Sequence, residues 1–341
     1  MNKKVSLKDI AQKVGVSAAL VSYVLNDKKT GRINKDVAQK IKEVAEQLHY
    51  RTNHIARSLK TNKTFTIGLI VSNISNTFSS TLARIIEDEA YKNDYTVLFG
   101  SSDESIEKSL RLMEVLLNHR VDGLIIAPSE ESETQILYLQ ENDIPFVLID
   151  RYLPQVKTNY VAIDNYKSSH ELVKHLIDNG NKRIGIVTFK SSLINLLERK
   201  RGYTSAMKEH KLAVKKSWIK EVGNNNIERD VQAAIDDLLS LPEPIEAIMF
   251  ASNTLTACGL KYINTLPLTV PDDLAIAAFD QSEASEIFYA PLTHIKQPLE
   301  EMGQMATRIL LELINKNNRI TQVNMDAELV VGKSSIKGIR S

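Results

Sequence analysis

The sequence predicts a small all-α head of the helix-turn-helix type, followed by two α/β lobes, each built on a doubly wound parallel sheet. Residues 1–63 contain two short helical patterns around a glycine and carry a formal charge of +9, against +1 for the whole chain. From residue 65 onward, β-branched runs alternate with helical patterns, which is typical of parallel sheets covered by helices. About ten strands over roughly 270 residues suit two sheets better than one.

The head begins with a helix that Ser6 is expected to cap, because Asp9 follows three residues later in a capping-box pattern. Its apolar residues then recur on one face at Leu7, Ile10, Ala11 and Val14. Gly15 is expected to end this helix and Ser17 to cap a second one, whose apolar residues are Leu20, Val21, Val24 and Leu25. Two short helices across a tight glycine turn form a helix-turn-helix, whose second helix can enter the major groove of DNA.

The rest of the head is basic. A loop over 27–33 is well placed for a phosphate backbone, and a longer helix is expected after Asn34. A short, weak helix over 53–60 buries little apolar surface alone, so we expect DNA or a partner chain to order it. Residues 64–341 carry a formal charge of −8. This asymmetry favours a head that contacts nucleic acid, although a solvated charged face is the alternative for a charge run considered by itself.

Composition limits the class of protein. The chain of 341 residues is 43% hydrophobic and 25% charged, which is ordinary for a globular protein with a sizeable core. No apolar signal segment opens the sequence, and the longest apolar runs are too short to span a bilayer. Cys258 is the only cysteine, which excludes an internal disulfide. We therefore expect a cytoplasmic protein without a membrane segment, metal or cofactor.

The lobes are predicted as alternating elements. The expected strands are 65–71, 96–100, 123–127, 145–150, 161–164, 183–188, 219–222, 247–251 and 274–280. The expected helices are 79–93, 104–118, one before 145, one ending at 179, 196–210, 227–240 and 255–266. Ligands of such sheets bind beyond the carboxyl ends of the strands. The segments that follow strands are therefore the candidate site, namely 73–76, 101–103, 150–151, 164–165, 189–190, 252–253 and 280–281.

Ordered short matches along nearly the whole chain resemble the LacI/GalR family of bacterial transcriptional regulators. They include Leu7-Lys8-Asp9-Ile10-Ala11, Gly15-Val16-Ser17, Val121-Asp122-Gly123-Leu124-Ile125, Asp150-Arg151, Arg199 with Gly202-Tyr203, Phe279-Asp280 and 291–298. The resemblance implies a head and two periplasmic-binding-protein-like lobes that dimerise and hinge around a small ligand, with crossings near 162, 292 and 323. The implied domains are 1–52 for the head, 53–64 for the hinge helix and linker, 65–162 with 293–323 for one lobe, and 163–292 with 324–341 for the other.

For the head, the resemblance implies that Ala18, Ala19 and Tyr23 choose bases, while nearby polar and basic residues hold phosphates. Two alanines can contact only a thymine methyl, and Tyr23 replaces the more usual arginine of the family. Leu59 matches a residue that wedges into the minor groove. In the alternative interpretation Ser17 only caps, Tyr23 only packs and Leu59 is a linker residue. The implied DNA contacts are Ser6, Ser17, Ala18, Ala19, Ser22, Tyr23, Asn26, Lys28, Lys29, Arg32, Asn53, His54, Ala56, Arg57 and Leu59.

For the lobes, the resemblance implies a ligand site that suits sugar hydroxyls. The implied ligand contacts are Asn76, Phe78, Asp150, Arg151, Asp164, Phe189, Arg199, Asn253 and Asp280. Carboxylates can accept hydroxyl protons and Arg199 can donate a fork of hydrogen bonds. Two alternatives stay open: Phe78 belongs to the core, and Asp164 caps the following helix. Lys190 and Arg151 add positive charge, so an acidic sugar is conceivable.

We therefore predict a transcriptional regulator, acting as a repressor, that binds a palindromic DNA operator as a homodimer under the control of a sugar-like effector. An enzyme is the first rival, but the sequence lacks a dinucleotide-binding glycine pattern, a P-loop, a nucleophile elbow and clustered histidine ligands. No catalytic residue is therefore predicted. An exported solute-binding protein is the second rival, and the basic head opposes it.

Overall fold

The computed structural model describes residues 5–25, 33–48, 50, 63–317 and 319–338. The chain divides into two compact units, Met1–Thr64 and Phe65–Ser341. Among the described helices, none combines the length and the apolar character that crossing a membrane requires.

The described part of the head forms the predicted helix-turn-helix and a third helix. Its helices are α1 (Leu7–Val14), α2 (Ala18–Leu25) and α3 (Lys35–Gln47). The backbone amide and the hydroxyl of Ser6 both donate to the carboxylate of Asp9, at 2.8 and 2.7 Å. Gly15 ends α1 in the left-handed region with φ of +83°, which glycine adopts at little cost. The hydroxyl of Ser17 accepts a bond from the amide of Leu20, so the predicted cap of α2 is confirmed.

The three helices of the head share one small core. Ile10, Val21, Val24 and Ile41 are fully buried in it, one or two from each helix. Helices this short are marginal alone, so their packing on one another stabilises the head. The predicted helix over 53–60 lies outside the described residues.

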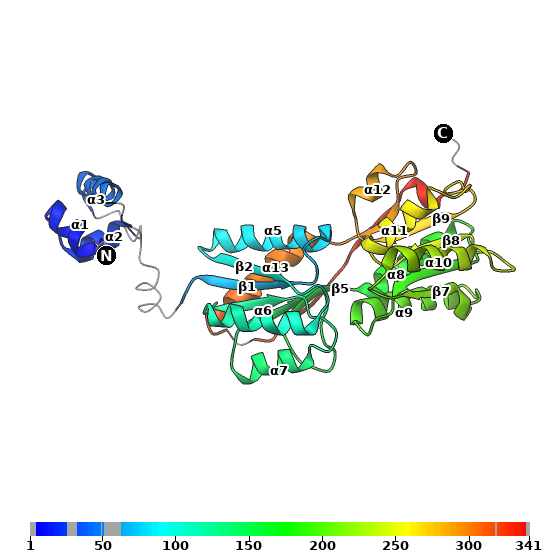
Figure 1. Cartoon of the computed structure of the whole chain (residues 1–341), viewed down its shortest axis with the longest axis horizontal. Helices are drawn as coiled ribbons and strands as arrows, with labels where there is room; N and C mark the ends of the chain where they lie inside the picture. The colour runs from blue at the N-terminus through cyan, green and yellow to red at the C-terminus, as the bar shows by residue number, and fades with distance from the viewer. Residues whose placement is uncertain (1–4, 26–32, 49, 51–62, 318, 339–341) are drawn as a thin grey trace. The chain divides into compact units, whose positions relative to one another are not determined.

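The first lobe contains a six-stranded sheet whose strand neighbours are all parallel, in the order β11-β5-β4-β3-β1-β2. The strands are β1 (Thr66–Val71), β2 (Thr96–Ser101), β3 (Gly123–Ile126), β4 (Phe146–Ile149), β5 (Tyr160–Ile163) and β11 (Gln322–Met325). Its helices are α5 (Thr77–Lys92), α6 (Ile106–Asn118), α7 (Glu133–Glu141) and α13 (Leu299–Ile314). Helices α5 and α13 cover one face, and α6 and α7 lie on the other (Figure 1).

Side chains of β1 point alternately to the two faces of the sheet and so contribute to the core on each face. Ile67 and Leu69 join the core that contains Ile86 of α5, whereas Ile70 joins the core that contains Met113 of α6. The sequence of a strand that is buried on both faces is a continuous apolar run, because neither face contacts water. That run is the reason why the sequence predicts this strand so clearly.

The second lobe repeats the arrangement with the strand order β12-β10-β9-β8-β6-β7. The strands are β6 (Ile184–Phe189), β7 (Ile219–Val222), β8 (Ala247–Phe250), β9 (Ala275–Phe279), β10 (Thr293–Lys296) and β12 (Glu328–Val330). Only the pairing of β12 with β10 is antiparallel among these described strands. The helices are α8 (Asn165–Asp178), α9 (Ile194–Glu209), α10 (Ile227–Leu239), α11 (Asn253–Ile263) and the short α12 (Glu283–Ile287).

The chain crosses between the lobes three times, and one predicted crossing is misplaced. The prediction ended the second lobe at residue 292 and assigned 293–323 to the first. However, Thr293–Lys296 forms β10, which pairs with β9 and β12 of the second sheet. This crossing therefore falls at Gln297-Pro298, after the strand has completed its ladder. The other crossings follow β5 and β11, so the first sheet extends to residues 163 and 325, slightly beyond the predicted 162 and 323.

Several elements were missed or begin earlier than predicted. The edge strands β11 and β12 were not predicted as strands, and their residues are at most half-buried, so they lack an apolar run. Helix α13 was not predicted either. Helix α5 begins two residues before the predicted start because the side chain of Asn76 caps it, accepting a bond from the amide of Phe78 at 3.0 Å. Ser252 caps α11 in the same way and moves its start to Asn253.

Candidate functional site

A cleft lies between the two lobes, lined largely by residues that follow strands of both sheets. Its empty volume is about 1100 Å³, including space open to solvent. Open parallel sheets place their ligands at this edge. Eight of the nine predicted ligand-binding residues line it, namely Asn76, Phe78, Asp150, Arg151, Phe189, Arg199, Asn253 and Asp280.

Asp164, the ninth predicted residue, does not line this cleft. Its carboxylate accepts a hydrogen bond from the amide of Lys167 at 2.9 Å and so caps α8. It lines a separate small pocket with Tyr152 and Glu198. Among the described residues it therefore has the capping role that was the alternative interpretation. The structure therefore does not bring Asp164 to the cleft that the other eight predicted residues line.

Two aspartates occupy equivalent positions at the strand ends of the two sheets. Asp150 follows β4 and Asp280 follows β9, and both have left-handed backbones, with φ of +69° and +71°. Aspartate is among the few non-glycine residues that adopt this region readily. Both carboxylates are almost completely buried at the edge of the cleft.

Arg199, on α9, is held in place by three neighbouring segments. Its Nε donates to Oδ1 of Asn165 at 2.8 Å, and its Nη1 donates to the carbonyl oxygen of Ala251 at 2.8 Å. The guanidinium lies 4.0 Å from the centre of the Phe279 ring. Burial lowers the pKa of Arg199, while the carboxylate of Asp280, 3.9 Å from Nη1, opposes that shift. The side chain is therefore rigid, and within the described residues its Nη2 has no hydrogen-bond partner.

Asp280 has the opposite response to burial. Burial raises the pKa of its carboxyl above the ordinary 3.8, while Arg199 and a hydrogen bond from Gln297 act against this shift. The Nε2 of Gln297 donates to Oδ1 of Asp280 at 2.5 Å. The Oε1 of Gln297 is buried and has no partner among the described residues, although Gln297 lines the cleft. An unpaired buried acceptor is costly, so it marks a place where a ligand donor would be favourable.

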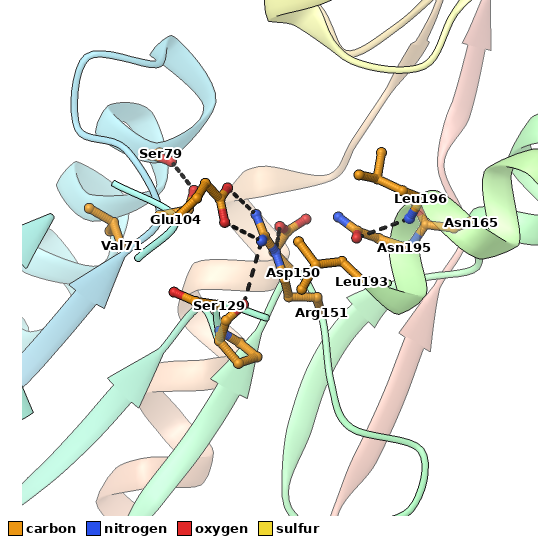
Figure 2. A network of polar contacts seen from close by, with 12 residues as sticks. Val71, Ser79, Glu104, Ser129, Asp150, Arg151, Asn165, Leu193, Asn195 and Leu196 are labelled. Atoms are coloured by element: carbon orange, nitrogen blue, oxygen red, sulfur yellow. Dashed lines mark hydrogen bonds and ion pairs between the residues drawn. The ribbon is translucent and has the colours of Figure 1, made fainter. Parts of the chain in front are cut away.

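Arg151 is bound to carboxylates of its own lobe. Its Nη1 and Nη2 donate to the two oxygens of Glu104 at 2.8 and 3.0 Å, and its Nε donates to Asp150 at 3.1 Å, as Figure 2 shows. Burial alone would lower the pKa of Arg151, but the charges of Glu104 and Asp150 raise it above its ordinary value. Lys190, the other predicted source of positive charge, is exposed and does not line the cleft.

Direct bonds connect the two lobes at two places along the cleft. The side-chain amides of Asn76 and Asn253 bond reciprocally, at 3.0 and 2.6 Å. One oxygen of Glu130 accepts bonds from the hydroxyl of Ser191 at 2.6 Å and from the amide of Ser192 at 2.5 Å. These contacts are possible only when the lobes are close together, so they stabilise a closed arrangement.

Aromatic and further polar side chains complete the lining. Phe78 and Phe189 are half-buried: each packs against the core and also lines the cleft, so the two interpretations of Phe78 are compatible. Asn73, Asp103 and Ser252 also line the cleft and lie in the predicted strand-end segments. The lining residues that the sequence did not single out as site residues are Ser72, Glu104, Glu130, Ser191, Leu193, Asn195, Leu196, Asn224, Ile227, Thr254 and Gln297. Glu104 directly follows a predicted segment and Gln297 lies within the matched stretch 291–298, whereas Asn195 and Glu130 carry no local signal.

In the head, the predicted base-reading residues lie on one short helix. Ser17, Ala19 and Tyr23 are exposed, with Tyr23 at 52%, while Ala18 and Ser22 are half-buried. The ring of Tyr23 is therefore accessible on the surface of α2. Ser6 is exposed and bonded to Asp9. The remaining predicted DNA contacts lie outside the described residues: Asn26, Lys28, Lys29, Arg32, Asn53, His54, Ala56, Arg57 and Leu59.

Comparison with known proteins supports both halves of this description. The family model of the lacI family of bacterial regulatory proteins matches residues 6–53, and that of periplasmic binding proteins and the sugar binding domain of the LacI family matches residues 64–327. The chain belongs to the LacI family.

No group of three or more possible metal-binding side chains occurs within the described residues.

Individual members of the LacI family match over almost the full length. The chain is 31% identical to a probable HTH-type transcriptional regulator, EndR, of Paenibacillus polymyxa, over 92% of each protein. It is 30% identical to the HTH-type transcriptional repressor PurR of Aliivibrio fischeri, over 97% of this chain and 98% of that protein. A crystal structure of the lac repressor dimer bound to operator and an anti-inducer shares the fold, with a TM-score of 0.85, 21% identity and coverage of 98% and 100%. The protein is thus a LacI-family regulatory protein with a DNA-binding and a ligand-binding domain.

Proposed function

We propose that this protein is a cytoplasmic homodimer that represses transcription from a near-palindromic operator, with its DNA affinity controlled by a sugar-like ligand in the cleft between the lobes. The observation that carries the proposal is the convergence of Asp150, Arg199 and Asp280 on one cleft, in a chain that also has an exposed helix-turn-helix face.

The chemistry of the cleft suits a polyhydroxylated ligand. Asp150 and Asp280 can accept bonds from hydroxyl groups, and Nη2 of Arg199 can donate to a hydroxyl or ring oxygen. Oε1 of Gln297 is a further acceptor without a partner among the described residues. The rings of Phe78 and Phe189 offer apolar faces on which the C–H groups of a sugar ring can pack. The family model that matches the lobes is itself described as a sugar binding domain.

The proposed dimer would cover apolar surface on the first lobe. Strand β2 is an edge strand, and its Leu98 and Phe99 are exposed at 37% and 61%. Tyr91 on α5 and Val115 on α6 are also exposed, and both helices pack beside β2. An exposed apolar edge strand is an aggregation hazard unless another surface covers it. A second copy of the chain would cover it and would bring two heads to one operator.

The proposed mechanism is a population shift. A ligand that bonds to both lobes favours one of their relative orientations and thereby changes the spacing of the paired heads. Two heads related by a two-fold axis require two half-sites in a fixed register. Tyr23 and the two alanines would contact base edges, and Leu59 would enter the minor groove between them. We propose that ligand binding lowers the affinity of the protein for the operator, so that the operator is released.

The experiment that tests this function selects DNA from a random duplex library with the purified full-length protein. The expected result is a palindromic site bound by a dimer, with a bound mass that corresponds to two chains. A thermal-shift screen of uncharged monosaccharides and disaccharides then searches for the ligand. A ligand at a hundredfold over its Kd adds about 2.7 kcal/mol to the free energy of unfolding. Recovery of no preferred sequence, or of a site without symmetry, would contradict the proposal.

A further inference from the structure

The cleft has an excess of negative charge. Five carboxylates line it, those of Asp103, Glu104, Glu130, Asp150 and Asp280, against the two guanidinium groups of Arg151 and Arg199. Because the cleft is partly enclosed, these charges act on a ligand with less screening than they would in bulk water. The charge balance matters for the choice of ligand, since each guanidinium already lies beside a carboxylate of the protein.

Arg151 is not available to an anionic ligand. Glu104 takes both of its Nη groups in a bidentate pair, Asp150 takes Nε, and the carbonyl oxygen of Pro128 accepts from Nη1 at 3.4 Å. The side chain is only 7% exposed. A bidentate pair between a guanidinium and a carboxylate is a strong, geometrically specific contact. A phosphate or carboxylate of a ligand would therefore have to displace Glu104.

Arg199 cannot bind an anionic ligand in place of Arg151. Its Nε and one Nη1 hydrogen are bonded, and its charge lies next to the buried carboxylate of Asp280. An anionic group placed beside Asp280 would meet a second negative charge at close range. Glu130 has no ion-pair partner within the described part of the chain, and its oxygen already accepts bonds from Ser191 and Ser192. The carboxylate of Glu130 thus also repels anions in the cleft.

We propose that the cleft binds an uncharged or amine-bearing polyhydroxylated ligand and excludes sugar acids and sugar phosphates, and that Glu104 sets this selectivity by occupying Arg151. This inference rests on the proposed ligand-sensing function and narrows its substrate class. It argues against the acidic sugar that the charges of Arg151 and Lys190 had left conceivable. A cationic amine would be attracted by the excess carboxylates, whereas an anion would be repelled by them.

The experiment measures binding by calorimetry to the wild-type protein and to two variants. The probes are matched by ring and differ in charge: glucose with glucosamine, glucuronate and glucose 6-phosphate, and the same series built on galactose. Glu104→Gln keeps the shape of the side chain but removes the charge that engages Arg151. Glu107→Gln is the matched control, because it makes the same change at a neighbouring exposed carboxylate that accepts a bond from Ser105 and does not line the cleft.

The wild type is expected to bind no anionic probe more tightly than its uncharged counterpart. Glu104→Gln is expected to bind glucose 6-phosphate or galactose 6-phosphate at least tenfold more tightly than the wild type, whereas binding by Glu107→Gln changes by less than twofold. Tight binding of an anionic probe by the wild type would overturn the proposal. So would a Glu104→Gln protein that melts cooperatively and gains no more than the control.

The wild-type measurements decide the matter even if Glu104→Gln does not fold, because exclusion of anions is a property of the native cleft. Failure of the proposed function has a different signature. It would appear as the absence of a preferred operator, which is measured without any sugar, whereas failure of this inference would appear only in the charge dependence of binding.

Discussion

Replacement of Arg199 by methionine should destabilise the lobes through the charge that it leaves behind. Methionine fills a similar volume but removes the hydrogen bonds to Asn165 and Ala251 and the cation nearest to Asp280. Removing one partner of a buried pair costs about 3–5 kcal/mol. We expect the lower end, about 3 kcal/mol, because the pair is 3.9 Å apart and Gln297 still donates to Asp280. For a unit of this size, that corresponds to a fall in Tm of about 6–12 °C.

The stability that Arg199→Met loses should be smaller at low pH than at neutral pH. The pKa of Asp280 is raised by burial above its unfolded value of 3.8, so the folded state binds the extra proton and stability falls as pH rises through the folded pKa. Without Arg199 the folded pKa rises further, so the window of falling stability extends to higher pH. The variant should therefore be less destabilised at pH 5 than at pH 7. Calorimetric melting at both values measures the difference.

A second substitution separates the charge from the packing. Asp280→Asn keeps an acceptor for Gln297 but removes the charge, so the double variant Arg199→Met with Asp280→Asn should recover at least half of the lost stability at pH 7. If the double variant melts no higher than Arg199→Met alone, an uncompensated carboxylate is not the cause and the reasoning fails.

Three further predictions concern other parts of the chain. Gly202→Ala should lower the free energy of unfolding by about 3 kcal/mol, because the added Cβ would meet the backbone of Tyr166 where α8 and α9 pack; a melting curve measures this. Phe99→Lys should convert the dimer into a monomer in sedimentation experiments, since it places a charge on the exposed edge strand. Tyr23→Ala should weaken operator binding by about tenfold, measured by fluorescence anisotropy, while ligand binding stays unchanged, because Tyr23 is exposed on the head.

Each of these three predictions can be checked against a control variant or against an outcome that would contradict it. Gly223→Ala should have little effect, since its Cβ would meet only an Asp230 carboxylate oxygen at 3.7 Å; equal losses for the two glycine variants would refute the packing argument. A Phe99→Lys protein that remains dimeric would place the interface elsewhere. If Tyr23→Ala binds the operator as tightly as the wild type, α2 does not read DNA through this residue.

The fold was largely predictable because its signals are local. Gly15 with its flanking serine caps defines the turn between α1 and α2, and runs such as Thr66–Val71 stand out because both faces of the sheets are buried. The strands β11 and β12 have no such signal, because they lie at sheet edges and are half-exposed. The misplaced crossing at 292 has a similar cause: what assigns β10 to the second sheet is its pairing with β9, which no local pattern records.

The site was predictable where chemistry coincides with a strand end. Asp150 and Asp280 directly follow apolar strands, so the topology alone brings them to the cleft. Pairings between side chains that are distant in the sequence are a different matter. That Glu104 occupies Arg151 depends on side-chain geometry across 47 positions of sequence, so the sequence alone left an acidic sugar conceivable.

The most direct test of the account is the affinity of the full-length protein for its selected operator, measured with and without a saturating concentration of the ligand found by thermal shift. Allosteric coupling of this kind is typically about 1–3 kcal/mol, so we expect the operator Kd to rise between about 5-fold and 150-fold when the ligand is bound. The ligand affinity should fall by the same factor when operator is present. A ligand that fills the cleft and leaves the operator Kd unchanged would contradict the coupling between lobes and head.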